Sequence, residues 1–373
     1  MKRRKGYGDF RSSILVASFA VLLMGMLMVT MAAYDVPGAG DAMRTLPVTR
    51  PSTVPVLPAT YDIERDGIPV LCHHFLRENS GPLLTLRILG ALFLNLPLLD
   101  DMDVWTQTVD AFERQMRYLH EQGYRSIDLD DVIAWQEGSL ELPPKCVVIT
   151  FDDGDRSVQL AAPILERYGF TATLFITTGK VGKTWEGIES LDWDELWELQ
   201  MSGRFSIQSH THDLHYHVKT PEGRMPAVLA ASRGIYDMDG AKSWRRAIFE
   251  DLRESRRVIA QRLGTIPRFL AWPYGFADSE LDSIAVAAGF RAACTLELGT
   301  NKRTDRTGTV SRAARWPGSD PRYPATIPFY RTHKRADTSP VGRAWERFEV
   351  RRYTITARTS ARAFREMMAV QPQ

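Results

Sequence analysis

The sequence predicts an α/β protein, built either as a (β/α) barrel or as a doubly wound parallel sheet. Short apolar runs alternate with segments whose apolar residues have helical spacing. The strongest run, residues 146–151, is almost continuously apolar, as expected for a strand covered on both faces. With 373 residues, 44% of them hydrophobic, the chain is long enough to bury a sizeable core.

The alternation of strands and helices runs from residue 67 to about residue 300. A short strand at 67–74 follows a turn signal. Ligands in such folds bind at the carboxyl ends of the strands, so we expect the functional residues directly after the strands. We expect helices at 109–122, 130–137, 161–168, 193–202, 247–263 and 279–288, and strands at 124–129, 146–151, 173–177, 204–209, 269–272 and 292–296.

Three segments depart from this pattern. Residues 35–66 are rich in Pro and are expected to form an extended linker. Residues 301–373 are rich in Arg and Pro and are assigned to a C-terminal extension, partly packed on the domain at 67–300. An apolar insertion at 77–105 contains a leucine-rich stretch at 82–99. This stretch either packs on the core or forms a flap that dips into a membrane interface.

The N-terminus has the pattern of an exported protein. Residues 1–11 form a basic tail, and residues 12–34 are uncharged and rich in Leu, Met, Val and Ala. About 20 apolar residues can span the hydrocarbon core, and preceding positive charges favour a cytoplasmic N-terminus. We expect a single-pass transmembrane signal-anchor at 12–34, with the folded domain outside the cytoplasm. A cleaved signal peptide and a buried helix are the alternatives.

Charge and cysteine content narrow the function classes. The net charge is +2 and no basic patch with interleaved aromatic residues occurs, so no nucleic-acid partner is expected. Cys72, Cys146 and Cys294 each lie in a strand-like apolar run and are expected to be buried thiols. No Cys-x-x-Cys metal motif occurs in the sequence.

Two adjacent carboxylates, Asp152 and Asp153, end the strongest predicted strand, and Gly154 follows them. Adjacent side chains at a strand end point in different directions. One carboxylate can therefore bind a metal while the other stays free to accept a proton. The structural alternative is a capping Asp beside a turn Asp, because Asp-Gly is a common turn dipeptide.

Histidine is concentrated just after the predicted strand at 204–209. Four of the eight histidines lie within residues 210–217. Two imidazoles, from His210 and His215, and one carboxylate are a usual catalytic ligand set for zinc, with a fourth position left for water. The alternative is a group of ordinary hydrogen-bonded histidines. His212 and His217 fit less clearly, either behind the ligands or exposed.

These residues lie in three ordered motifs that resemble those of the polysaccharide deacetylases, also called NodB-homology proteins or family 4 carbohydrate esterases. Thr-Phe-Asp-Asp-Gly is intact at 150–154, Ser-His-Thr-His-Asp-Leu-His at 209–215 is similar to the second motif, and Trp-Pro-Tyr-Gly at 272–275 looks like the third. The spacing of the two histidines resembles the branch that deacetylates poly-β-1,6-N-acetylglucosamine. The resemblance covers roughly residues 67–300.

The resemblance implies an incomplete or distorted (β/α) barrel with one divalent metal. Asp153, His210 and His215 would bind the metal, and Asp152 would be the general base. Zinc is the first expectation from the ligand types, and cobalt, nickel, manganese or iron would also fit an Asp-His-His site. The metal would polarise the acetamide carbonyl and sharpen the attacking water.

Four further residues are candidates for the substrate site. Trp272 and Tyr274 could stack on a sugar ring or simply pack at a strand end, and the backbone N–H of Tyr274 could help to hold the oxyanion. His73 and His74, at the end of the first strand, could line the site.

Two features depart from the family pattern. Family members often have an Arg that orients the base three residues before the third-motif Tyr, but this chain has Ala271 there. The late Leu-His motif that usually supplies the general acid is also missing, and residues 296–298 are Leu-Glu-Leu.

We therefore expect hydrolysis of N-acetyl groups from an extracytoplasmic N-acetylglucosamine polysaccharide, at the surface of a bacterial cell membrane. Poly-β-1,6-N-acetylglucosamine is the first candidate, and polysaccharide synthesis or export machinery is a candidate partner. Peptidoglycan, chitin-like and O-acetylated glycans are alternative substrates. A catalytically weak glycan-binding export protein is the alternative from another class.

Overall fold

The computed structural model describes residues 61–78, 104–221, 223–236, 244–303, 349–357 and 359–368. The described residues all belong to one compact unit. The predicted anchor at 12–34 and the leucine-rich stretch at 82–99 lie outside the described residues. Within the described ranges, no helix combines the length and the apolar character needed to span a membrane.

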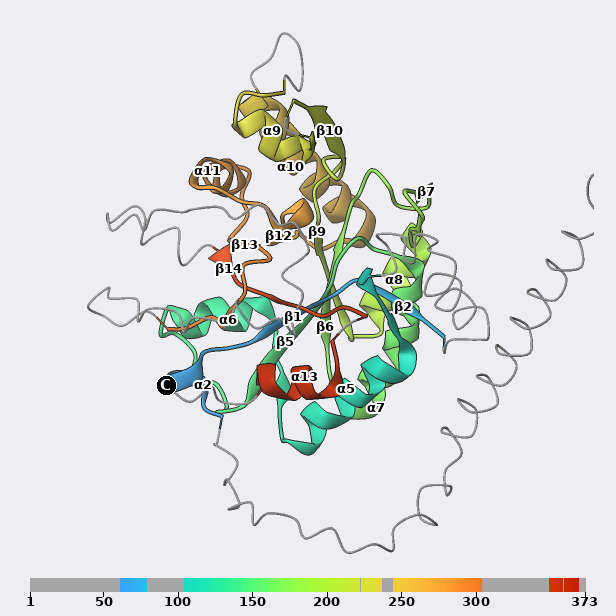
Figure 1. Ribbon diagram of the computed structural model, residues 1–373, viewed down its shortest axis with the longest axis vertical. Coiled ribbons are helices and arrows are strands. Elements are labelled where there is room, and N and C mark those ends of the chain that lie inside the picture. Colours follow the sequence, from blue (N-terminus) through green and yellow to red (C-terminus); the bar gives the residue numbers. More distant parts are fainter. Residues whose placement is uncertain are drawn as a thin grey trace, which may run out of the picture. The chain divides into compact units, whose positions relative to one another are not determined.

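A single parallel sheet of nine strands forms the centre of this unit (Figure 1). Its order is β14-β13-β12-β9-β6-β5-β1-β15, and β4 pairs with β5. The predicted α/β class with parallel strands is confirmed. The strands are β1 (Val70–His73), β4 (Arg125–Ser126), β5 (Cys146–Phe151), β6 (Ala172–Ile176), β9 (Phe205–Ser209), β12 (Phe269–Ala271), β13 (Ala292–Cys294), β14 (Glu349–Val350) and β15 (Tyr353–Thr354).

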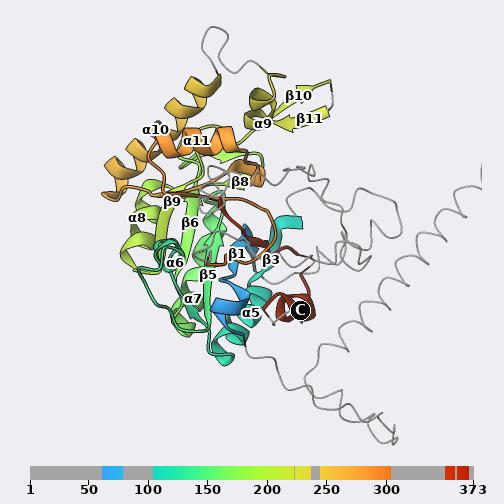
Figure 2. The same cartoon turned by 90° about the vertical axis from the view of Figure 1, so that its left-hand side faces the viewer.

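Helices surround the outside of the sheet (Figures 1 and 2). The helix α5 shows why they form: Phe112, Met116 and Leu119 recur at helical spacing and are buried, and the Thr108 hydroxyl caps the first turn by accepting from the N–H of Ala111 at 3.2 Å. The helices are α2 (Ile63–Asp66), α5 (Val109–Glu121), α6 (Leu129–Gln136), α7 (Ala162–Tyr168), α8 (Trp193–Met201), α9 (Ala227–Ser232), α10 (Trp244–Leu263), α11 (Ser279–Ala287) and α13 (Ala361–Met368).

The expected strand at 124–129 is wrong over most of its length. Only Arg125–Ser126 pairs with β5. Asp128 and Asp131 form a capping box that begins α6 at Leu129, and local side-chain capping outweighs the strand-like composition there.

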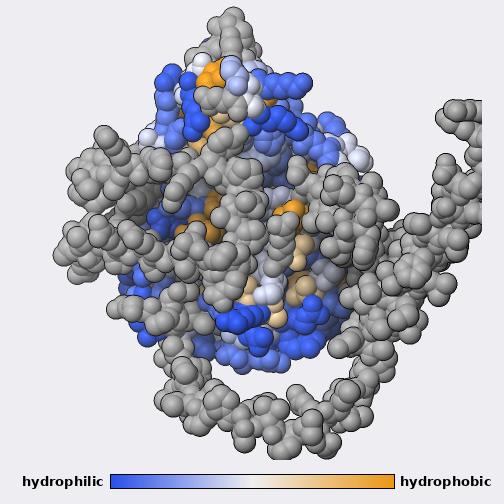
Figure 3. Space-filling view, viewed as in Figure 1, coloured by the Kyte–Doolittle hydropathy of each residue, from blue (hydrophilic) through white to orange (hydrophobic). Residues whose placement is uncertain are grey.

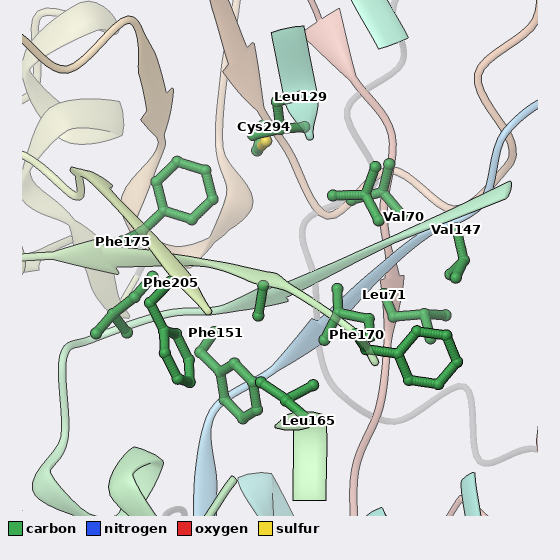
Figure 4. Close-up of a cluster of buried hydrophobic side chains, with 14 of the residues drawn as sticks. Val70, Leu71, Leu129, Val147, Phe151, Leu165, Phe170, Phe175, Phe205 and Cys294 are labelled. Carbon is green, nitrogen blue, oxygen red and sulfur yellow. The ribbon is translucent and has the colours of Figure 1, made fainter. Parts of the chain in front are cut away.

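Apolar side chains fill both faces of the sheet. Figure 4 shows Phe151 beside Leu165 on one side of the strands, whereas Phe175 and Cys294 lie on the other. All four residues are buried, as the continuous apolar pattern of the central strands predicts. The three cysteines are free thiols and are buried, as expected. The described surface in the view of Figure 3 is largely hydrophilic.

The segment at residues 349–354 joins the two edges of the sheet. Glu349 and Val350 pair with β13 at one edge, and Tyr353 and Thr354 pair with β1 at the other. Only residues 351 and 352 separate these two short strands, drawn in red in Figure 1. The sheet therefore curls on itself and is closed by residues of the predicted C-terminal extension. This closure places residue 352 inside the curled sheet.

Smaller elements decorate the loops. They are the paired strands β2 (Phe75–Arg77) and β3 (Thr106–Thr108), the hairpin of β7 (Thr184–Trp185) and β8 (Ile188–Glu189), the hairpin of β10 (His217–Thr220) and β11 (Gly223–Pro226), and the 3₁₀ turns η1 (Arg156–Ala161) and η2 (Pro273–Gly275). The sequence pattern indicated none of these.

Candidate active site

The chain turns sharply after β5, and this turn separates two neighbouring carboxylates. Asp152 still follows the strand, because its N–H donates to the carbonyl of His73 at 3.0 Å. Asp153 (φ 71°) and Gly154 (φ 74°) then adopt left-handed backbone conformations. Such a conformation is uncommon for a residue with a side chain. A Cβ on Gly154 would lie 3.0 Å from Ile176, so glycine suits this position on two counts.

Asp153, His210 and His215 converge on one point, as the prediction requires. Asp153 Oδ1 lies 3.4 Å from Nε2 of His210 and 3.2 Å from Nε2 of His215. One ligand atom from each of the three residues lies within 4.8 Å of the others. Asp153 Oδ1 is buried and has no hydrogen-bond partner among the described residues. A buried carboxylate oxygen facing two imidazole nitrogens fits a divalent cation.

A backbone carbonyl orients the imidazole of His210. Nδ1 of His210 lies 2.8 Å from the carbonyl oxygen of Ala271, so Nδ1 carries the hydrogen and donates it. The lone pair of His210 is then on Nε2, which faces Asp153. Burial alone would raise the pKa of Asp153, but the proximity of His210 and His215 outweighs burial and holds that pKa well below its usual range.

Asp152 is held by a buried arginine. Arg352 donates Nη1 to Oδ1 at 2.7 Å and Nη2 to Oδ2 at 2.8 Å, and both side chains are buried. Burial alone would raise the pKa of Asp152, but the charge of Arg352 outweighs burial and the pKa is lowered. The bidentate pair fixes the carboxylate plane as well as its charge. Asp152 is thus an ionised carboxylate directly beside the candidate metal ligands.

Arg352 is the residue that the sequence analysis missed. We noted that Ala271 stands where the family often has a base-orienting Arg. The structure provides a guanidinium from residue 352, between β14 and β15, and its Nε donates to the carbonyl of Thr295 at 2.9 Å. Arg268, close to Ala271 in sequence, instead pairs with Asp130 at 3.0 Å. The stretch 349–356 is rich in β-branched residues and could have predicted a strand that carries Arg352. It lies within a tail rich in other arginines, so this one did not stand out.

His74 lies next to Asp152, whereas His73 does not. A ring nitrogen of His74 lies within 4.8 Å of both the sulfur of Cys72 and a carboxylate oxygen of Asp152. Since Arg352 bonds to both oxygens of Asp152, a second cation in this cluster would face a fixed positive charge. His74 Nδ1 is buried and without a hydrogen-bond partner among the described residues, and burial lowers the pKa of this imidazole.

His73 is in the core, so its expected place at the substrate site is wrong. Its Nδ1 lies 3.0 Å from Oε1 of Gln107, and its ring contacts Phe112 and Phe151 with centroids 5.2 Å away in each case. Successive side chains of a strand point to opposite faces, so His73 and His74 cannot both face the site.

The two aromatic residues of the third motif also differ: one is in the core and the other is at the site. Trp272 is fully buried and its Nε1 donates to Asp282 on α11 at 3.3 Å, so it packs against this helix and cannot stack on a sugar. The backbone of Tyr274 has φ 60°. The centroid of its ring lies 4.4 Å from that of the His215 ring and 4.1 Å from that of the His217 ring. Tyr274 is therefore the aromatic residue of this motif at the site.

One aromatic neighbour was not expected. Trp185, in the β7–β8 hairpin, meets His215 edge-on with ring centroids 5.0 Å apart, and its Nε1 donates to Ser190 at 2.8 Å. It is only partly buried, so with Tyr274 it forms an aromatic border around His215.

Part of the chain matches a known protein family. Residues 139–293 match the family described as polysaccharide deacetylase. A poly-beta-1,6-N-acetyl-D-glucosamine N-deacetylase from Staphylococcus aureus is 25% identical over 229 residues, which are 59% of this chain and 73% of that protein. Its counterpart from Staphylococcus epidermidis is 26% identical over 52% of this chain and 62% of that protein.

Solved structures have the same fold. IcaB from Ammonifex degensii is 26% identical, with a TM-score of 0.51 over 76% of this chain and 97% of that one. A de-N-acetylase from Aggregatibacter actinomycetemcomitans shares the fold, with a TM-score of 0.53, 24% identity and coverage of 65% and 92%. The curled parallel sheet and the match over residues 139–293 indicate a polysaccharide deacetylase domain, and the similar proteins indicate a deacetylase hydrolase.

Proposed function

We propose that this protein removes N-acetyl groups from an N-acetylglucosamine polysaccharide in a metal-dependent hydrolysis, and that poly-β-1,6-N-acetylglucosamine is its substrate. The observation that carries the proposal is the division of labour between neighbouring carboxylates. Asp153 faces two imidazoles, whereas Asp152 is ionised and paired with Arg352. The names of the relatives in Staphylococcus aureus and Staphylococcus epidermidis support the choice of polymer.

Asp153, His210 and His215 would hold one divalent ion, with zinc the first choice for these ligands. When bound, such an ion acts as a Lewis acid on a carbonyl oxygen and makes bound water more acidic. Asp152 accepts a proton from the attacking water, and Arg352 keeps that carboxylate ionised and oriented. The backbone N–H of Tyr274 is the candidate protein donor to the oxyanion.

The leaving nitrogen also needs a proton. In the reaction, the water oxygen bonds to the acetyl carbon, the carbon–nitrogen bond breaks, acetate departs and the sugar amine gains hydrogen. His74 is the candidate donor, because its imidazole lies beside Asp152 and its Nδ1 has no partner among the described residues. This assignment fills the role that the missing Leu-His motif left open.

The alternative hypothesis, a catalytically weak glycan-binding protein, loses one of the two observations that favoured it. It was based on the absent base-orienting Arg and the absent acid, and Arg352 takes the first of these places. For the location, we propose attachment to a bacterial membrane through residues 12–34 with the domain outside the cytoplasm. The basic tail and apolar run of the sequence support this proposal.

A substrate panel tests the proposal. The full-length protein, supplied with zinc, is incubated with poly-β-1,6-N-acetylglucosamine, chitin oligomers, peptidoglycan and an O-acetylated glycan, and released acetate is measured. We expect the fastest release from the first, and a loss of about 10²–10⁴-fold in Asp152→Asn. Faster release from another polymer would replace the substrate, and no acetate from any of them would reject the enzyme activity.

A further inference from the structure

The loop between His210 and His215 has a conformation that its own sequence does not favour. Thr211 has φ 73°, in the left-handed region that β-branched residues rarely adopt. The two candidate metal ligands lie on either side of this turn. Since an unfavourable backbone conformation persists only where the surroundings impose it, contacts from outside the loop must hold it.

A carboxylate on α10 accepts two hydrogen bonds from the middle of this loop. Asp251 Oδ1 accepts from the N–H of His212 at 2.8 Å, and Oδ2 accepts from the N–H of Asp213 at 2.8 Å. Successive backbone N–H groups beside a left-handed residue form a concave site for an anionic group. Both oxygens of Asp251 are thereby directed at the loop between the ligands.

The opposite side of the loop is held by the residues after β6. The N–H of Thr178 donates to the carbonyl of Thr211 at 3.2 Å, and the N–H of Gly179 donates to that of His212 at 2.8 Å. The Thr178 hydroxyl lies 2.8 Å from Nδ1 of His212. A Cβ on Gly179 would lie only 2.7 Å from the His212 carbonyl oxygen. The loop is therefore clamped between β6 and α10.

The helix that carries Asp251 is itself fixed against the sheet. Ile248 and Leu252, on either side of Asp251 in the sequence, are fully buried. One turn further on, Ser255 Oγ lies 2.7 Å from Ser209 Oγ, at the end of the strand that precedes His210. The carboxylate of Asp251 is thus a fixed point relative to the strand that delivers the first ligand.

We propose that Asp251 is a positioning residue that sets the geometry of the metal-binding loop and thereby the affinity for the metal. The inference rests on the proposed function, since it concerns the same metal site. Asp251 touches neither metal ligand side chain in the described contacts. It acts through the backbone of His212 and Asp213, so its removal should loosen the spacing between His210 and His215 while leaving all three ligands in place. Groups behind metal ligands typically change metal affinity by about 10- to 100-fold.

The test measures zinc affinity without substrate. Zinc is titrated against a competing chelator in the full-length protein and in Asp251→Asn and Asp251→Ala. Asp282→Asn is the matched control, because Asp282 is a buried carboxylate on the neighbouring helix α11 and accepts from Nε1 of Trp272. We expect a loss of affinity of at least 10-fold in Asp251→Ala, a smaller loss in Asp251→Asn, and a change under twofold in Asp282→Asn. The visible spectrum of bound cobalt should shift only in the Asp251 variants.

The outcomes separate the possible failures. Zinc affinities of both Asp251 variants within twofold of the natural protein would overturn the inference. Equal losses in Asp251→Asn and Asp282→Asn would also overturn it, since they would mark general destabilisation. If Asp251→Ala does not fold, the comparison of the two Asn variants decides. Weak zinc binding by the Asp251 variants supports the inference even if no glycan releases acetate, whereas a natural protein that binds no divalent ion overturns both proposals.

Discussion

The regions around Asp152 and Asp153 are built in opposite ways although the two residues are neighbours. Asp152 has both oxygens bonded to Arg352, a residue 200 positions away in the sequence, in a fully buried ion pair. Asp153 faces two imidazoles and keeps an oxygen without a partner among the described residues. The first carboxylate is satisfied by the fold itself, and the second is left for a ligand.

The comparison shows how one strand end can supply two different chemical roles. Breaking a buried ion pair leaves a charge without its partner, which typically costs about 3–5 kcal/mol of stability. Replacing a carboxylate whose oxygen lacks a partner should cost less stability in the metal-free protein. We therefore expect changes in the Asp152 region to affect folding and activity together, and changes in the Asp153 region to affect mainly metal binding and activity.

The largest effect should follow Asp153→Asn. Loss of the anionic member of the proposed ligand set should remove the metal and lower kcat/KM by about 10³-fold or more, since metal stabilisation contributes several kcal/mol to the transition state. Metal content and acetate release measure the two effects. Asp152→Asn is the matched change one residue earlier, and it should lose activity while keeping the metal. Full metal content in Asp153→Asn would break the comparison.

The next effect concerns the buried pair. Arg352→Met and Asp152→Asn should each lower the free energy of unfolding by about 3–5 kcal/mol, because each leaves one buried charge unpaired. The double variant should be less destabilised than the sum, as measured by chemical denaturation of the metal-free protein. Arg351→Met is the control: its side chain is partly exposed and pairs with Glu297 at 3.3 Å, so a change below about 1 kcal/mol is expected. Equal effects of the two arginines would contradict the proposed role of the pair.

A pH dependence should mark the support behind the histidine loop. Burial is the main cause that raises the pKa of Asp251 to about 7, the charges of Asp213 and Glu254 add to it, and the backbone bonds to residues 212 and 213 oppose it. A carboxyl whose pKa is higher in the folded than in the unfolded chain binds a proton preferentially in the folded state. Its stabilising contribution is complete below about pH 4 and is lost as the pH rises through about 7.

Between pH 8 and pH 5, the natural protein should therefore gain about 2–3 kcal/mol of stability relative to Asp251→Asn, at about 1.4 kcal/mol per pH unit below the folded-state pKa. Denaturation curves of both proteins at the two pH values measure the difference. A gap between the two proteins that is the same at pH 5 and pH 8 would show that Asp251 is ionised in both states throughout this range.

The smallest effects should separate the two aromatic residues of the third motif. Trp272→Phe removes a buried side chain and its bond to Asp282, so we expect a loss of about 1–2 kcal/mol of stability with KM unchanged. Tyr274→Leu removes the ring next to His215 and should raise KM about 2- to 10-fold with little change in stability. A raised KM in Trp272→Phe would instead place that residue at the substrate.

Much of the fold and of the metal site followed from local patterns. The run at 146–151 is a buried strand because it is apolar throughout, and Phe112, Met116 and Leu119 predicted α5 by their spacing. Asp152, Asp153, His210 and His215 were singled out because they follow strands whose carboxyl ends must meet in a parallel sheet, and the resemblance to the family motifs selected Asp153 as the metal ligand. The strand expected at 124–129 failed because Asp128 and Asp131 start a helix through side-chain capping.

Sequence alone determined the α/β class and the positions of most of the central strands along the chain, since these depend on periodicity. Strand ends together with the family motifs singled out the three residues that converge on a candidate metal. Tertiary structure decided which histidine of the pair 73–74 faces the site, that Trp272 is core and Tyr274 is not, and that Arg352 holds Asp152. These outcomes depend on strand facing and on a pairing of residues 349–354 with both sheet edges. Such long-range pairing leaves no periodic trace in the sequence, because it is selected by the fit of a whole closed sheet.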